Sequence, residues 1–157
     1  MAASDKIKVR VTTKFRPASS ELLAVGYIDD ADRYADAAKQ LTDFKHFNPR
    51  YFLYCHAIEL ALKAYILASG GDDREVRKIK HDLGKAYRRA SELGYTPALD
   101  GTAEIVDWLH PYHQDYAFRY KQTGIRAVPR PEDIDEVINS MLLEIEKTAR
   151  AAFKRRA

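Results

Sequence analysis

The sequence has little cysteine, and it lacks the loops that mark the commonest catalytic sites. Its single cysteine, Cys55, cannot form an internal disulfide, which favours a reducing cytoplasm. Cys55 lies within a predicted core helix, so we interpret it as a small buried apolar residue rather than a catalytic thiol. No glycine-rich phosphate loop, paired-cysteine motif or serine-nucleophile motif is present. Any activity must therefore be inferred from less specific patterns.

Long apolar runs are also missing. None reaches the roughly 18 residues that a membrane span requires. The longest run is interrupted by His56, Glu59 and Lys63, so we expect no membrane partner. Residues 1–16 alternate in charge and have no apolar core, which is not the pattern of a secretory signal. Together these features predict a cytoplasmic protein.

The charge is nearly balanced overall but unevenly placed along the chain. The 157 residues carry a net charge of +3, and a chain of this length is most simply one domain. Acids exceed bases between Ser20 and Asp43, whereas bases exceed acids from Arg74 to Arg89. The stretch from Arg119 to Arg130 contains four bases and no acid. This separation is typical either of a basic face that meets a polyanion or of ordinary solvated helix surfaces.

Apolar residues recur at helical spacing through most of the chain, which predicts an all-α fold. Residues 19–157 are expected to form one up-and-down antiparallel bundle of four to five helices. Residues 1–18 are expected to form an N-terminal arm, in which 6–11 could be one short strand. The expected helices begin near residues 20, 48, 81, 102 and 131, with a short helical turn at 74–79.

The most apolar of these helices is expected to lie in the centre of the bundle. Asn48 is its predicted cap and Pro49 its first residue, and the helix is expected to end at Gly70. His56, Glu59 and Lys63 fall on one side of it. One interpretation is an ion pair that fixes how this helix packs, because buried charges need partners. The other is a pocket for a nucleotide phosphate, with Lys63 as the cation.

Three landmarks of the chain resemble the HEPN (higher eukaryotes and prokaryotes nucleotide-binding) domain family. The first is the run from His56 to Tyr65 followed by a glycine, and the second is His81-Asp82-Leu83 at the start of the next helix. The third is a tyrosine-rich helix end with Tyr112 and Tyr116, followed by Arg119-Tyr120. The resemblance covers roughly residues 20–153 and leaves out the N-terminal arm.

The resemblance implies a helical bundle that pairs as a homodimer and has a link to nucleotides or RNA. Many HEPN proteins are ribonucleases of toxin–antitoxin or defence systems, and others are non-catalytic and accompany nucleotidyltransferases. The partners expected on this basis are RNA or a nucleotide, a second copy of the chain, and an antitoxin or nucleotidyltransferase.

Arg50 and His56 are the candidates that we consider for the arginine–histidine pair of the nuclease members. Five residues separate them, within the four to six that the family uses, but they lie on the second helix and Tyr51 follows the arginine. Histidine suits general-base catalysis and arginine suits the charge of a phosphorane. Six residues span about 600° of helix, so one chain presents the two side chains poorly. The alternative is a structural His56 bonded to Glu59 or His81.

The remaining candidates concern metal and nucleic acid. His110 and His113 have a spacing that can hold a metal, but Pro111 separates them and no third ligand is evident, so no metal or cofactor is expected. Basic and aromatic residues alternate late in the chain, a composition that suits phosphate contact and base stacking or, alternatively, a loop anchored by its aromatics. The predicted ligand-binding residues are Lys63, His81, Tyr116, Arg119, Tyr120 and Arg126, and Lys121 and Arg130 belong to the same basic run.

The sequence and the resemblance together favour a non-catalytic nucleotide- or RNA-binding module. The resemblance implies a toxin–antitoxin or defence system as its setting. One alternative is a metal-independent endoribonuclease that uses Arg50 and His56 across a dimer. The other is a purely structural partner of a nucleotidyltransferase.

Overall fold

The computed structural model describes residues 18–120 and 124–156. The described residues form six α-helices and one 3-10 turn, which confirms the all-α bundle and slightly exceeds the expected helix count. The helices are α1 (Ser20–Gln40), α2 (Phe47–Ala68), α3 (Asp73–Ile79), α4 (Leu83–Glu92), α5 (Thr102–Gln114) and α6 (Pro131–Arg156), with the 3-10 turn at Phe44–His46. The expected short strand, nearly all of the arm and Lys121 lie outside the described residues.

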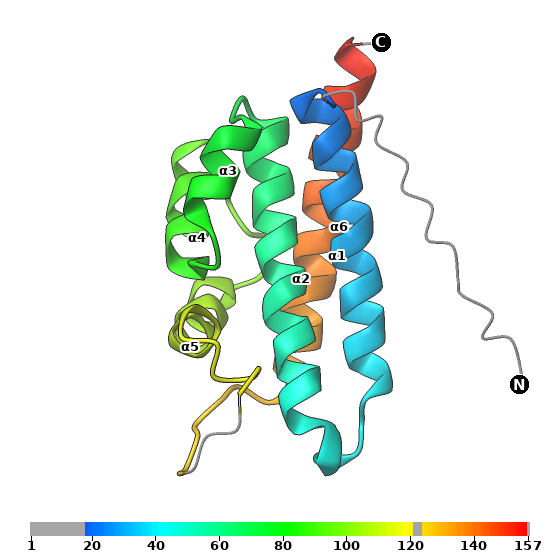
Figure 1. Ribbon diagram of the computed structural model, residues 1–157. Coiled ribbons are helices and arrows are strands. Elements are labelled where there is room, and N and C mark those ends of the chain that lie inside the picture. The colour runs from blue at the N-terminus through cyan, green and yellow to red at the C-terminus, as the bar shows by residue number, and fades with distance from the viewer. Residues whose placement is uncertain (1–17, 121–123, 157) are drawn as a thin grey trace, which may run out of the picture.

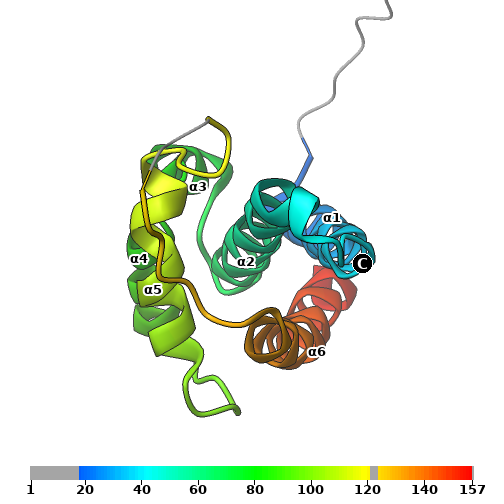
Figure 2. The same ribbon diagram turned by 90° about the horizontal axis from the view of Figure 1, so that it is seen from below.

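The three long helices α1, α2 and α6 lie side by side and make the main body (Figure 1). α1 runs antiparallel to α2 and to α6. Seen along the bundle, α2 lies between α1 and α6 on one side and α4 and α5 on the other (Figure 2). α5 lies across the bundle axis rather than along it. A side chain of α2 can therefore meet residues from every other part of the fold.

α2 is buried almost all round, as the sequence predicts for the central helix. Its apolar side chains include the fully buried Tyr54, Ile58, Leu62 and Ile66. With the 3-10 turn before it, the helix is long and apolar enough to cross a membrane by length and composition alone. In the protein, 78% of the most apolar 18-residue window of that stretch is buried. Such burial is typical of a helix in the core of a bundle.

The start of α2 differs from the prediction. The helix begins at Phe47 and follows directly on the 3-10 turn, so His46 and not Asn48 holds the cap position. The chain is already turning before Asn48, and the Asn48 side chain instead accepts a hydrogen bond from Arg126 (2.8 Å). Pro49 still falls in the first turn, where a backbone N–H needs no partner within the helix.

The segment between α2 and α4 places a histidine over the middle of α2. Asp72 caps α3 and Asp82 caps α4, each accepting a hydrogen bond from a backbone N–H. Lys80 ends α3 with φ at 55°, a conformation that side chains rarely adopt. This sharp turn leaves His81 between the two helices, facing α2.

Gly71 closes the turn after α2, and we expect it to resist substitution. A Cβ at this position would lie 2.5 Å from the Ile66 side chain and 2.8 Å from its carbonyl oxygen. Gly71→Ala should therefore lower the free energy of unfolding by about 1–3 kcal/mol, measured by urea denaturation. Gly26 lies on the exposed face of α1, and a Cβ there would have no atom of the described residues within 4 Å, so Gly26→Ala should instead raise it by about 1 kcal/mol. Equal effects of the two variants would contradict this view of the turn.

Candidate functional site

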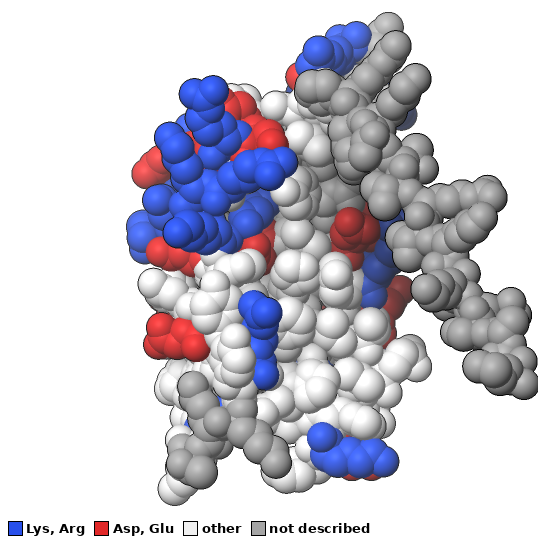
Figure 3. Space-filling view, viewed as in Figure 1, with Lys and Arg blue, Asp and Glu red and all other residues white. Residues whose placement is uncertain are grey.

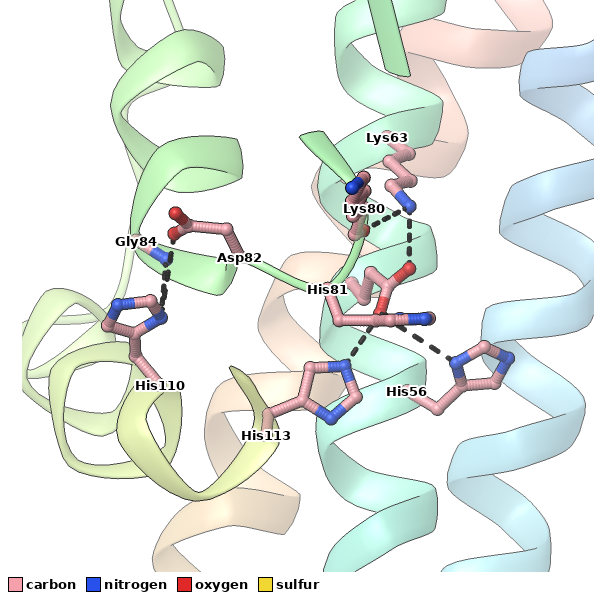
Figure 4. A network of polar contacts seen from close by, with 9 residues as sticks. His56, Lys63, Lys80, His81, Asp82, Gly84, His110 and His113 are labelled. Carbon is pink, nitrogen blue, oxygen red and sulfur yellow. Dashed lines mark hydrogen bonds and ion pairs between the residues drawn. The ribbon is translucent and has the colours of Figure 1, made fainter. Parts of the chain in front are cut away.

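A buried carboxylate on α2 collects polar side chains from three parts of the fold. Glu59 is only 2% exposed. Its Oε1 accepts a hydrogen bond from the Lys63 ammonium at 2.6 Å, one helical turn along α2. Its Oε2 lies 3.0 Å from Nδ1 of His81 and 2.6 Å from Nε2 of His113 (Figure 4). We call Glu59, Lys63, His81 and His113 the carboxylate cluster.

Hydrogen bonds keep this carboxylate ionised despite its burial. Burial by itself would raise the pKa of Glu59, but the bonds from His113, Lys63 and His81 outweigh it and hold the pKa at about 2. Because an ionised carboxylate only accepts hydrogen bonds, both histidine nitrogens that face it carry a hydrogen. The sequence interpretation of Glu59 and Lys63 as an ion pair that fixes helix packing agrees with these contacts.

Lys63 is held on both sides. Besides Glu59, its ammonium donates to the backbone carbonyl of Lys80 at 2.7 Å, so it ties α2 to the turn between α3 and α4. Its side chain is 9% exposed. The predicted role of Lys63 as a phosphate-binding cation is untested, but both of its contacts are internal.

His56 lies at the edge of the carboxylate cluster. Its Nδ1 is 3.9 Å from Oε2 of Glu59, and its ring stacks on Phe52 and meets Tyr34 edge to face. Burial lowers the pKa of His56, and the negative Glu59 only partly opposes this. His56 therefore favours its neutral form, in contact with the cluster but less tightly bonded than His81 and His113.

Arg119 covers the outer side of the histidines. Its guanidinium lies 5.9 Å from the centre of the Phe52 ring and 5.0 Å from that of Tyr116. Phe52 contacts the rings of His56 and His113, and Tyr116 contacts that of His81. The His81 side chain is 38% exposed and Tyr116 is 37% exposed, so this rim faces solvent. We call Phe52, Tyr116 and Arg119 the aromatic rim.

Backbone strain is concentrated at the same place. In the ranges 18–120 and 124–156, only two residues other than glycine have positive φ: Lys80 at 55° and Tyr116 at 56°. Lys80 precedes His81 in the chain, and Tyr116 packs on the His81 ring. Such conformations persist where surrounding contacts enforce them, and they cluster at functional sites.

The structure separates other predicted site residues from this cluster. Arg50 donates to the hydroxyl of Tyr54 (3.1 Å) and lies 3.9 Å from Asp135, whereas His56 faces Phe52 and Glu59. No contact joins Arg50 to His56 within the described chain, and the pairing of the two across a dimer stays a prediction.

Arg126 contacts residues outside the carboxylate cluster. Arg126 bonds Asn48 and lies over the ring of Phe118. It also borders a hollow of about 570 Å³ between α5 and α6, which Asp133 and Glu136 line as well. Tyr120 is 62% exposed, just before residues that the structure does not describe.

Two members of the site were missed from the sequence. His113 was considered only with His110, three residues before it, but the two rings point to different partners. His110 accepts a hydrogen bond from the backbone N–H of Gly84 and lies 3.5 Å from Asp82. Phe52 was not singled out, although it lies four residues before His56 on the same helix face.

A separate basic surface covers α3 and α4, where the sequence has its excess of bases (Figure 3). It surrounds a hollow of about 490 Å³. Arg89 is paired with Glu75 and Glu92. The other cations that line the hollow have no ion pair among the described residues: Arg74, Lys78, Lys85 and Arg88.

Chemically, the carboxylate cluster and the aromatic rim can bind an anion with an attached ring. Arg119 offers donors to a phosphate, and Tyr116 and Phe52 offer faces for stacking. The outer nitrogen of the partly exposed His81 adds a polar atom beside them. The carboxylate cluster beneath them fixes the position of His81.

Neutralising Glu59 should destabilise the protein in a pH-dependent way. Glu59→Gln leaves the Lys63 ammonium buried without its counter-charge, so at neutral pH we expect a loss of roughly 3 kcal/mol in the free energy of unfolding. The folded-state pKa lies below the ordinary 4.5, so the wild-type advantage should persist above pH 4.5 and disappear as the pH falls toward about 2. Urea denaturation at several pH values measures it, with the exposed Glu136→Gln on α6 as control. A Glu59→Gln deficit no larger than that of the control would contradict the ion pair.

Comparison with known proteins agrees with the fold and with the sequence landmarks. The HEPN domain family matches residues 24–149, which is most of the chain and includes all members of the carboxylate cluster and the aromatic rim. No curated protein and no solved structure matches the chain. The chain belongs to the HEPN domain family.

Proposed function

We propose that this HEPN domain is a non-catalytic module that binds a nucleotide or RNA at the aromatic rim. The observation that carries the proposal is the position of Arg119 over both Phe52 and Tyr116, with His81 beside them. One exposed cation between two aromatic faces matches the needs of a phosphate and a base.

His81 is the second proposed contact. Its Nδ1 is bonded to Glu59, which fixes the ring. The remaining nitrogen has no hydrogen bond to any described residue, and the partly exposed ring can present it to a ligand. Lys63 would contribute indirectly, because its ammonium holds the Glu59 carboxylate and the Lys80 carbonyl in position. Tyr120 and Arg126 would make contacts further along a longer ligand.

The basic surface on α3 and α4 supports an extended ligand. His81 lies in the turn that joins these two helices, so the surface begins close to the site. Arg74, Lys78, Lys85 and Arg88 would contact phosphates along a strand, which adds affinity without sequence preference.

The biological setting is also a proposal. HEPN domains commonly act as dimers, and we propose a homodimer in the cytoplasm with an antitoxin or nucleotidyltransferase as partner. The single cysteine, Cys55, is fully buried, in keeping with a reducing compartment. The endoribonuclease alternative predicts RNA cleavage by the pure protein, without added metal, that His56→Ala abolishes.

The test of binding compares Arg119, which lies in the aromatic rim, with an exposed arginine on α1. Arg119→Ala should weaken binding of a fluorescent single-stranded oligoribonucleotide about tenfold, because a charge-assisted contact is lost. The slope of log affinity against log salt should also fall by about 0.7. Fluorescence anisotropy across a salt series measures both quantities.

Arg33→Ala is the matched control for the same charge change. Arg33 lies exposed on α1, and its ion pair within residues 18–120 and 124–156 is with Asp30. If both variants weaken binding equally, the effect is one of net charge and the aromatic rim is not the site. If RNA affinity of the wild type does not depend on salt, the proposed phosphate contacts are absent.

A further inference from the structure

We infer that the carboxylate cluster is a site for a first-row divalent metal ion, with zinc as its best match. Three donor atoms converge there: Oε2 of Glu59, Nδ1 of His81 and Nε2 of His113, all within 4.8 Å of one another. They come from α2, from the turn before α4 and from α5. The inference goes beyond the proposed function and does not depend on it, and it replaces the sequence expectation of no metal.

The donor chemistry suits zinc. Two imidazole nitrogens and one carboxylate oxygen form a ligand set that zinc uses with an open fourth position. Ligands about 2.0–2.1 Å from a tetrahedral zinc lie about 3.3 Å apart. The two nitrogen–oxygen separations here are 2.6 and 3.0 Å, so each nitrogen needs to move away from Oε2 by less than 1 Å.

The surrounding contacts resemble those that orient metal ligands. Lys63 occupies Oε1 of Glu59 and leaves Oε2 to face the histidines. Its second bond, to the carbonyl of Lys80, holds the ammonium on the far side of the carboxylate. Hydrogen bonds of this kind to a ligating carboxylate fix its direction.

An ion could reach the site from solvent, and a fourth ligand lies close to it. Glu59 and His113 are buried, but the side chain of His81 is 38% exposed and gives an entry path from solvent. His56 places Nδ1 at 3.9 Å from the same Oε2, near enough to approach the open position, which water can also fill.

The competing interpretation is a purely structural network in which the histidines are hydrogen-bond donors to Glu59. The two interpretations differ in one measurable respect. A structural network has no use for an ion, whereas a metal site must lose affinity when any donor is removed, even one whose loss leaves the fold intact. His81 is the informative residue, because it is partly exposed and its substitution costs the core least.

The experiment uses the full chain without a histidine tag. Metal-free protein is dialysed against excess zinc chloride, passed over a desalting column and analysed for bound metal by mass spectrometry. We expect one zinc per chain, and for His81→Gln and His113→Gln a loss of affinity above 100-fold, since even outer-shell changes cost 10–100-fold. Cobalt in place of zinc should give visible absorption bands, which the variants lack.

His110→Gln is the matched control, because His110 lies on the same helix as His113 but faces Gly84 and Asp82. It should retain zinc fully, and circular dichroism should show the helical signal of the wild type in all three variants. The inference is overturned if the wild type retains no zinc, if His81→Gln retains as much as the wild type, or if His110→Gln loses it equally. Arg119→Ala should keep zinc while losing RNA, which separates failure of this inference from failure of the proposed function.

Discussion

The buried carboxylate of Glu59 is the interaction on which the rest of the site depends. A charge placed in the centre of a helical bundle must find partners, and Glu59 finds them in Lys63, His81 and His113. These partners belong to α2, to the turn between α3 and α4, and to α5. One carboxylate therefore connects the long-helix body of the fold to the smaller helices beside it.

The solvent-facing features follow from that connection. His81 is fixed at one nitrogen and partly exposed, and Tyr116 packs against its ring with a strained backbone. Arg119 lies over the rings of Tyr116 and Phe52, so the most accessible cation of the site is supported by residues that pack on the histidines of the core. Strain at Lys80 and Tyr116 is tolerated because contacts on both sides hold these residues in place.

Binding at the aromatic rim and metal binding in the carboxylate cluster would use different atoms of neighbouring residues. A ligand on the rim needs the outer edge of His81 and the guanidinium of Arg119, whereas an ion needs Nδ1 of His81 and the buried partners behind it. The basic surface of α3 and α4 adds charge at longer range and adjoins the site through the turn that carries His81.

The sequence by itself determined what depends on local spacing. Apolar periodicity placed the long helices and the burial of α2, and residues four apart on a helix made Glu59 and Lys63 a pair. Family landmarks marked His81, Tyr116 and Arg119 as residues of interest. Only the tertiary structure decided which of these residues meet, because a contact such as that between Glu59 and His113 joins positions 54 residues apart and depends on how α5 crosses the bundle. Spacing along one helix indicated that Arg50 and His56 point in different directions, but only the tertiary structure shows which neighbours each one meets.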